Sequence, residues 1–171
     1  MKNVFALFAL FSLILFSNTF AQQTKNQKQT IDSALIMRRQ MIHSRSSLVM
    51  PFNMNKVTHY FFDTKSGGVL KIKAKDSKDT SQVNLIREHL KKEHDLFSNG
   101  NFGDPKTLHG MNMPGLKTLK SSRDKYKFEY KVLSDGAQLS FISKDSVVIN
   151  ALHRWFAAQL RDHGSDAKNH E

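Results

Sequence analysis

The stretch YKFEYKVLSDGAQLSFI, residues 126–142, decides the fold. In its first half, aromatic or β-branched residues alternate with charged residues, which is the period of a strand with one buried face. Asp135-Gly136 is a typical hairpin turn, and Ala137–Ile142 supplies the returning strand. The stretch therefore predicts a half-buried β-hairpin.

A second hairpin is predicted earlier in the chain. Val57–Asp63 is rich in β-branched and aromatic residues, and Ser66-Gly67-Gly68 forms a turn. In Val69–Lys75, apolar residues alternate with lysines. Because a face that carries several lysines cannot be buried, we expect each hairpin to place only its other face on the core.

A helix is predicted after each hairpin. Lys-Asp-Ser ends both hairpins, at 75–77 and at 144–146, and apolar residues then recur at helical spacing over about 80–97 and 146–163. The order is ββα, a long loop over 98–125, and ββα again. We interpret this order as an α+β fold: a ββα-ββα repeat with an antiparallel four-stranded sheet and both helices packed on one face.

The first 21 residues have a different character. Lys2 is followed by the apolar run Val4–Phe16, a polar step, and Thr19-Phe20-Ala21 with small residues at the two recognition positions. This is the three-part form of a secretory signal peptide, and the run is too short for a comfortable membrane span. We expect cleavage after Ala21, export to the periplasm or the exterior, and no stable membrane span afterwards.

The rest of the chain is expected to divide into three parts. Residues 22–47 form a linker and a short N-terminal helix, since 22–34 is rich in Gln, Lys and Thr with little to bury. Residues 48–166 form a single α+β domain. Residues 167–171 form a disordered tail.

Length and composition limit the possible functions. The chain has 171 residues, 26 Lys+Arg against 15 Asp+Glu, a formal charge of +11 and no cysteine. The length excludes a two-domain enzyme with separate cofactor and substrate domains. The lack of cysteine excludes a disulfide scaffold, a thiolate metal site and a cysteine nucleophile, and it fits an oxidising compartment. No nucleotide or flavin signature is present.

Polar residues interrupt the apolar faces of both predicted helices. His89 and Glu93 are four residues apart within the apolar arc of the first helix, so they lie one above the other. In the second helix, Gln159 and His163 lie within the arc and His153 lies at its edge. A buried imidazole or carboxylate is costly unless it is paired or hydrogen-bonded, so this pattern predicts a polar site on the buried side.

This polar set predicts a metal site. Imidazole with thioether suits copper, and imidazole with carboxylate suits zinc. The 98–125 loop adds a histidine beside Gly110 and a methionine, and the first strand adds another histidine. We expect copper or zinc to be bound by His59, His89, Glu93, His109, Met113, His153 and His163. The structural alternative is that each histidine is a satisfied core or helix-end residue.

Two other functions use features of the same sequence. In a small hydrolase or lyase, metal-assisted or not, Glu93 would orient His89 as a general base and a second histidine would act as the acid. In a polyanion-binding module, Lys71, Lys73, Lys75, Lys127 and Lys131 would line the exposed sheet face. Nucleic acid is not expected as the partner, because the aromatic residues of 126–130 should point to the other face. The expected partner is a metal ion or a small molecule.

Several motifs occur in one order over roughly residues 48–166. They are Met50-Pro51-Phe52, His59 with Phe61, Ile86-Arg87-Glu88-His89-Leu90, Leu108-His109-Gly110, Met113-Pro114-Gly115-Leu116, Ala151-Leu152-His153-Arg154-Trp155-Phe156 and Gln159-Leu160-Arg161-Asp162-His163-Gly164. Together they resemble a family of small exported bacterial proteins whose members are often labelled aspartate carbamoyltransferase. True transcarbamoylases are longer, two-domain cytosolic enzymes with a Ser-Thr-Arg-Thr-Arg phosphate loop, which this sequence lacks. The resemblance therefore implies one compact exported domain rather than that activity.

Overall fold

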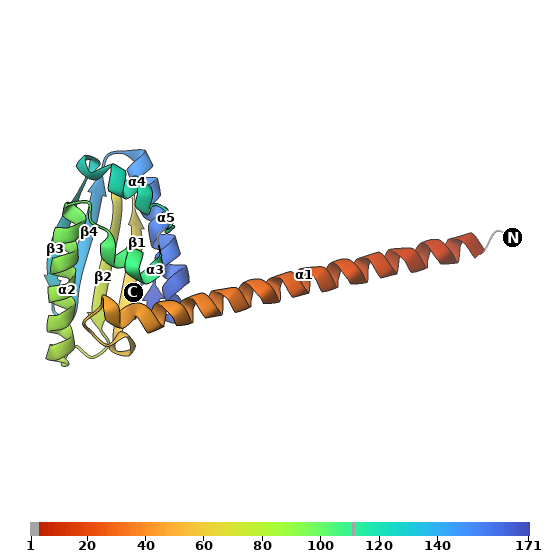
Figure 1. Ribbon diagram of the computed structural model, residues 1–171, viewed down its shortest axis with the longest axis horizontal. Helices are drawn as coiled ribbons and strands as arrows, with labels where there is room; N and C mark the ends of the chain where they lie inside the picture. The colour runs from red at the N-terminus through yellow and green to blue at the C-terminus, as the bar shows by residue number, and fades with distance from the viewer. Residues whose placement is uncertain (1–3, 111) are drawn as a thin grey trace. The chain divides into compact units, whose positions relative to one another are not determined.

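The computed structural model describes residues 4–110 and 112–171, with side chains from residue 22 onward. Its class is α+β (Figure 1), as predicted. The chain divides into two compact units, Met1–Arg38 and Arg39–Glu171, and each is described by itself.

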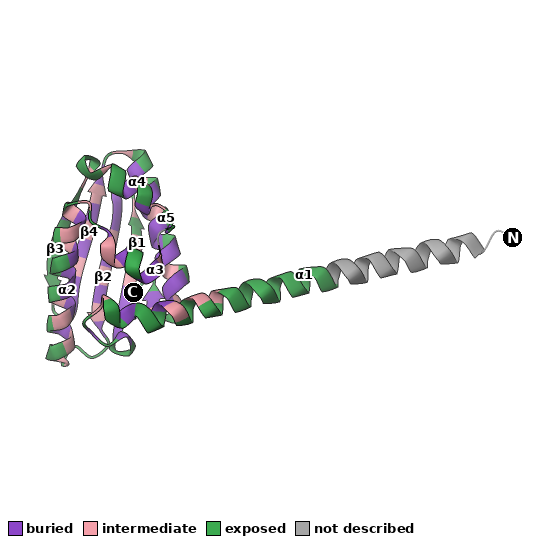
Figure 2. Cartoon of the chain, in the orientation of Figure 1, coloured by how far each residue is buried: buried purple, intermediate pink, exposed green. Residues whose placement is uncertain are grey.

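The first unit contains most of helix α1, Val4–Arg45. The expected linker over 22–34 is therefore helical, and its side chains are exposed (Figure 2). This segment contains no glycine or proline, and the Thr30 hydroxyl donates to the carbonyl of Asn26 one turn earlier. The signal-peptide prediction concerns residues 1–21, whose side chains lie outside the described residues. Within the described part of the chain, no helix has both the length and the apolar character that a membrane crossing needs.

The second unit is built on a mixed five-stranded sheet in the order β3-β4-β2-β1-β5. The strands are β1 (Val57–Thr64), β2 (Gly67–Ala74), β3 (Tyr126–Leu133), β4 (Gly136–Ser143) and β5 (Ala167–Lys168). The prediction of a four-stranded antiparallel sheet is wrong, because β5 pairs parallel to β1 within the expected tail. Two residues are too few to show a strand period, so the sequence pattern gives no sign of β5.

Both main helices lie close to their predicted bounds, as α2 (Thr80–Ser98) and α5 (Ser146–His163). Their starts are fixed by Asp79 and Asp145, whose carboxylates accept backbone N–H groups of the first turn. The two helices pack on the same face of the sheet (Figure 1). An aromatic cluster joins the helices to the strands: Phe61, Phe97, Phe128, Phe141, Trp155 and Phe156.

The segment expected as a long loop contains two short helices. They are α3 (Gly103–His109) and α4 (Leu116–Ser121). Each has at most about two helical turns, so neither is long enough for helical spacing of apolar residues to be recognised in the sequence. The interpretation of the two halves of the domain as copies of one ββα unit stays a prediction.

Candidate functional site

Five of the seven predicted ligands line one cavity of about 50 Å³. His59 comes from β1, His89 and Glu93 from α2, His109 from α3 and His163 from α5. All five side chains are buried. The polar residues that interrupt the helical core therefore meet at one place, under α3 and against the sheet.

Three of these histidines form a chain of ring contacts. The ring of His163 lies 5.1 Å, centre to centre, from that of His59 and also from that of His109. His59 and His163 are almost parallel, at 18°, whereas His109 meets His163 edge to face at 70°. The Phe52 ring contacts both His59 and His89, at 5.9 Å and 5.4 Å between ring centres.

A buried carboxylate orients His109. Its Nδ1 lies 3.0 Å from an Asp162 oxygen, and both side chains are essentially inaccessible to solvent. Because a carboxylate only accepts, Nδ1 carries a proton, and in the neutral ring Nε2 is the nitrogen with the lone pair. Arg161 donates to the other oxygen of Asp162 at 3.1 Å. Asp162 was not among the predicted site residues, although its position three residues after Gln159 places it on the same helix face.

A second acidic residue missed by sequence, Asp104 in α3, partners Glu93. Burial raises the pKa of Glu93 to about 9, and the hydrogen bond and charge of Asp104 add to this effect. Burial alone would raise the pKa of Asp104, but hydrogen bonds from Glu93 and Lys92 outweigh it and hold that pKa below its usual value. Lys92 lies 2.8 Å from Asp104. The pair therefore holds one proton on Glu93 and one negative charge on Asp104 at neutral pH.

Three of the cavity histidines, His59, His89 and His163, are uncharged at neutral pH. Burial lowers the pKa of His59 to about 3, with a further lowering from His89, while the backbone carbonyl of Asp166 opposes the shift. Burial lowers the pKa of His89 to about 4. Burial, followed by the neighbouring His59 and His109, holds the pKa of His163 well below its ordinary value. The imidazoles of these three residues therefore keep one N–H donor and one lone pair each.

Several buried polar atoms on the cavity wall lack a well-aligned hydrogen bond to any described residue. They include both ring nitrogens of His59, Nδ1 of His89, Oε1 of Gln159 and Nε1 of Trp155. Each such atom costs about 1–3 kcal/mol, and native proteins contain few of them. The four residues that carry these atoms all line the same cavity.

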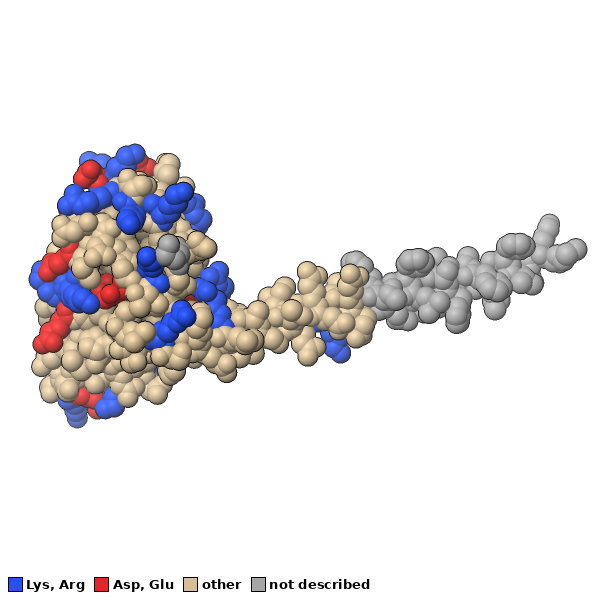
Figure 3. All heavy atoms as spheres, viewed as in Figure 1, with Lys and Arg blue, Asp and Glu red and all other residues tan. Residues whose placement is uncertain are grey.

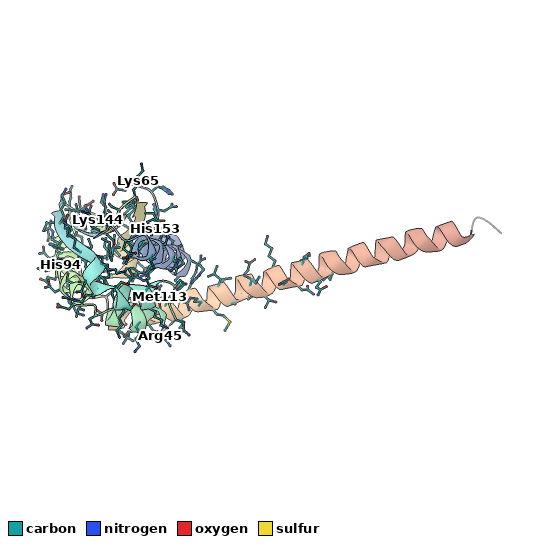
Figure 4. All side chains as sticks on the ribbon, turned by 90° about the horizontal axis from the view of Figure 1, so that it is seen from above. Arg45, Lys65, His94, Met113, Lys144 and His153 are labelled. Carbon is teal, nitrogen blue, oxygen red and sulfur yellow. The ribbon has the colours of Figure 1, made fainter. Side chains whose placement is uncertain are left out.

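Two of the predicted ligands lie elsewhere. His153 Nε2 lies 2.8 Å from the carbonyl of Gly67 and 3.2 Å from that of Thr64, at the β1–β2 turn. Met113 packs in the core and borders a surface groove beside α3 and α4. Figure 4 labels both residues and shows them apart from one another within the domain. His153 and Met113 therefore do not line the cavity that the other five candidate residues share.

The described residues contain no group of three or more His, Asp or Glu side chains arranged to hold a metal ion. The rings of His59 and His163 lie almost parallel rather than converging on one point. The copper or zinc assignment stays a prediction.

The open face of the sheet carries the predicted lysines, but most of them are paired. Lys71, Lys73 and Lys127 form ion pairs with Glu171, Asp135 and Glu129 respectively. Lys75 donates to the carbonyl of Asn55. The stacked rings of Tyr60 and Phe62 also lie on this face, which the sequence interpretation did not foresee. The pairing removes much of the positive charge on which the polyanion hypothesis depends.

Comparisons with protein-family models, with curated proteins and with solved structures give no match for this chain.

Proposed function

We propose that the buried cavity binds a small uncharged molecule that both donates and accepts hydrogen bonds. The observation that carries this proposal is the set of buried polar atoms on the cavity wall that lack a well-aligned hydrogen bond to any described residue. Trp155 offers a donor, Gln159 offers an acceptor, and the neutral ring of His59 offers the lone pair of its second nitrogen, because its N–H faces the backbone carbonyl of Asp166. A ligand with both functions would satisfy groups that otherwise cost several kcal/mol.

The charge state of the wall supports an uncharged ligand. His59, His89 and His163 are neutral, and Glu93 is protonated. Asp104 also lines the cavity and is negatively charged, but it is already paired with Lys92. A charged ligand would therefore lose its hydration without meeting an unpaired opposite charge, which is very costly in a buried site.

The cavity volume sets the size of the ligand. A volume of about 50 Å³ exceeds the 10–15 Å³ or so that one water needs, and it is far below the usual volume of a drug-sized site. A ligand of about four heavy atoms fits this range. At no more than about 1.5 kcal/mol per heavy atom, its affinity is limited to a Kd of about 40 µM or weaker.

The proposed place of action is outside the cytoplasm. The support for this is the sequence of residues 1–21, which has the three parts of a cleavable signal peptide. Expression with a tagged C-terminus, followed by N-terminal sequencing of the exported protein, tests it. A mature chain that begins at Gln22 is expected, and a full-length chain retained in the cytoplasm would contradict it.

The ligand class is tested with three probes of nearly identical shape: acetamide, acetone and acetate. Acetamide donates and accepts, acetone only accepts, and acetate is charged. We expect saturable thermal stabilisation of the tag-free protein in the order acetamide, acetone, acetate, with millimolar affinity for acetamide. Equal stabilisation by all three probes, or stabilisation by acetate alone, would contradict the proposal. So would a stoichiometric copper or zinc ion in the purified protein.

A matched pair of variants tests whether acetamide binds in this cavity. Gln159→Leu removes a polar group from the cavity wall at nearly constant volume and should weaken acetamide binding by about tenfold, as expected for one lost hydrogen bond. Gln138→Leu makes the same change on the open face of the sheet and should leave binding unchanged.

A further inference from the structure

We propose that the cavity is also an acid–base catalytic centre for small carbonyl compounds, in which Glu93 is the acid and His109 is the base. This inference rests on the proposed ligand site, because the substrate would occupy the same cavity. It is carried by a geometric arrangement that ligand binding alone does not require.

The two groups are anchored at opposite ends of one short helix. Asp104, the partner of Glu93, lies in the first turn of α3, and His109 is its last residue. Five residues of helical rise separate the backbone positions of Asp104 and His109 by about 7.5 Å along the axis of α3. Both Glu93 and His109 face the cavity that α3 covers. A molecule of about four heavy atoms in this cavity therefore has both the acid and the base on the wall around it.

The base has a fixed tautomer. Asp162 holds the proton of His109 on Nδ1, so Nε2 is the nitrogen with the lone pair. Asp162 also stabilises the imidazolium that forms when Nε2 takes a proton, as a buried carboxylate does in the Ser-His-Asp triad. Asp162 is therefore a positioning residue, and His109 is the catalytic residue.

Glu93, the proposed acid, is protonated, and its neighbour Asp104 stabilises that proton. Glu93 is buried, and its carboxyl hydrogen bonds to Asp104. Asp104 is partly exposed and is paired with Lys92, which is largely exposed. This arrangement links the acid to solvent, so that the proton on Glu93 is replaced after it leaves the site.

The step that fits this arrangement is enolisation. His109 Nε2 takes a proton from the carbon next to a carbonyl group, and the electron pair of that C–H bond becomes a C=C bond. The carbonyl π pair moves onto oxygen, which receives the proton of Glu93 after that O–H turns from Asp104 to the substrate. An enol, an imidazolium and the Glu93 carboxylate result, and reversal restores the carbonyl compound. No oxidant, reductant or cofactor is needed.

The test follows exchange of the carbon-bound protons of hydroxyacetone in D₂O by proton NMR. With the tag-free wild-type protein, we expect exchange above the rate in protein-free buffer. Glu93→Gln and His109→Asn should each lower the protein-dependent rate by about 100-fold or more, the usual loss for a general acid or base. His94→Asn, on an exposed part of α2, should match the wild type.

Binding and catalysis are separated by measuring hydroxyacetone binding through thermal stabilisation in the same samples. Binding without exchange above the buffer rate overturns this inference and leaves the ligand site intact. Absence of both binding and exchange overturns the ligand site itself. Exchange that survives in Glu93→Gln and His109→Asn also overturns the assignment of the two residues.

The role of Asp162 has a spectroscopic signature. In Asp162→Asn the amide can donate to Nδ1, so the ring proton of His109 should move to Nε2. Nδ1 should then show the ¹⁵N chemical shift of an unprotonated ring nitrogen, and Nε2 that of a protonated one. The exchange rate of hydroxyacetone should fall together with this change. An unchanged tautomer with an unchanged exchange rate would show that Asp162 does not set the tautomer of His109.

Discussion

At the residue scale, the cavity wall shows which side chains sequence can identify and which it cannot. Helical spacing singles out His89, Glu93 and His163, because a polar residue inside an apolar arc is visible in a single sequence. Their acidic partners are harder to find. Asp104 looks like a surface residue in a loop, and only the packing of α3 onto α2 brings it to Glu93.

The protonated state of Glu93 gives the first prediction. Its pKa rises from 4.5 to about 9 on folding, so the folded state holds a proton that the unfolded chain has lost between these values. The stabilisation is complete below pH 4.5 and is lost as the pH rises toward 9, by at most about 1.4 kcal/mol per pH unit. Urea denaturation should therefore show wild-type stability falling by about 2 kcal/mol between pH 7 and pH 9.

Glu93→Gln carries no proton to lose, so its stability should be nearly constant over the same range. Glu88→Gln, on the exposed side of the same helix, should decline as the wild type does. A wild type that is equally stable at pH 7 and pH 9 would mean that Glu93 is ionised in the folded protein.

His59 gives the second prediction, which separates a functional histidine from a structural one. His59→Phe keeps a ring of similar size and removes two nitrogens that lack a well-aligned hydrogen bond to any described residue. We expect the variant to unfold at higher urea concentration, with a gain of about 1–2 kcal/mol. His153→Phe should lose about 1 kcal/mol instead, because it removes the contacts with the carbonyls of Thr64 and Gly67. Destabilisation of both variants to the same extent would make His59 an ordinary core residue.

At the element scale, the long amphipathic elements follow from the sequence and the short ones do not. Alternation predicts the hairpins that become β1–β2 and β3–β4, and helical spacing predicts α2 and α5. α3, α4 and β5 are too short to show a period, and tertiary contacts place them. The closure of the cavity by α3 is therefore the part of the site that the sequence pattern does not reveal.

The glycines around α3 and α4 give the third prediction. Gly115 has a φ of +85°, and a Cβ there would lie 1.9 Å from the carbonyl oxygen of Ala151 in α5. Gly115→Ala combines left-handed strain with a backbone clash and should cost about 3 kcal/mol in urea denaturation. Gly110 has a φ of +93°, but no described atom lies within 4 Å of its Cβ position, so Gly110→Ala should cost only about 1 kcal/mol. Equal losses would mean that α4 does not rest on α5 as described.

At the scale of the whole molecule, the formal charge of +11 is distributed rather than concentrated in a functional surface. On the face of the domain seen in Figure 3, basic side chains are interspersed with acidic ones. On the open sheet face, Lys71 and Lys73 are already paired with Glu171 and Asp135. Net charge is readable from sequence, but its pairing depends on which strands become neighbours.

The fourth prediction concerns this charge. Neutralising Lys71 and Lys73 by Gln should lower the salt concentration of elution from heparin no more than neutralising Lys117 and Lys120, which border the groove beside α4. The two double variants carry the same net charge, so any difference reports a local polyanion site. A clearly larger decrease for the Lys71/Lys73 variant would restore the polyanion hypothesis.

The most direct test of the account is histidine-detected ¹H–¹⁵N NMR of the tag-free protein during titration with acetamide. His59 and His89 line the cavity, whereas His94 lies on an exposed part of α2 beside Asp95. We predict that the ring nitrogen resonances of His59 and His89 shift saturably with acetamide at millimolar concentration, and that those of His94 stay constant. Ring resonances of His59 and His89 that do not move, or that move no more than those of His94, would contradict the assignment of the buried cavity as a ligand site.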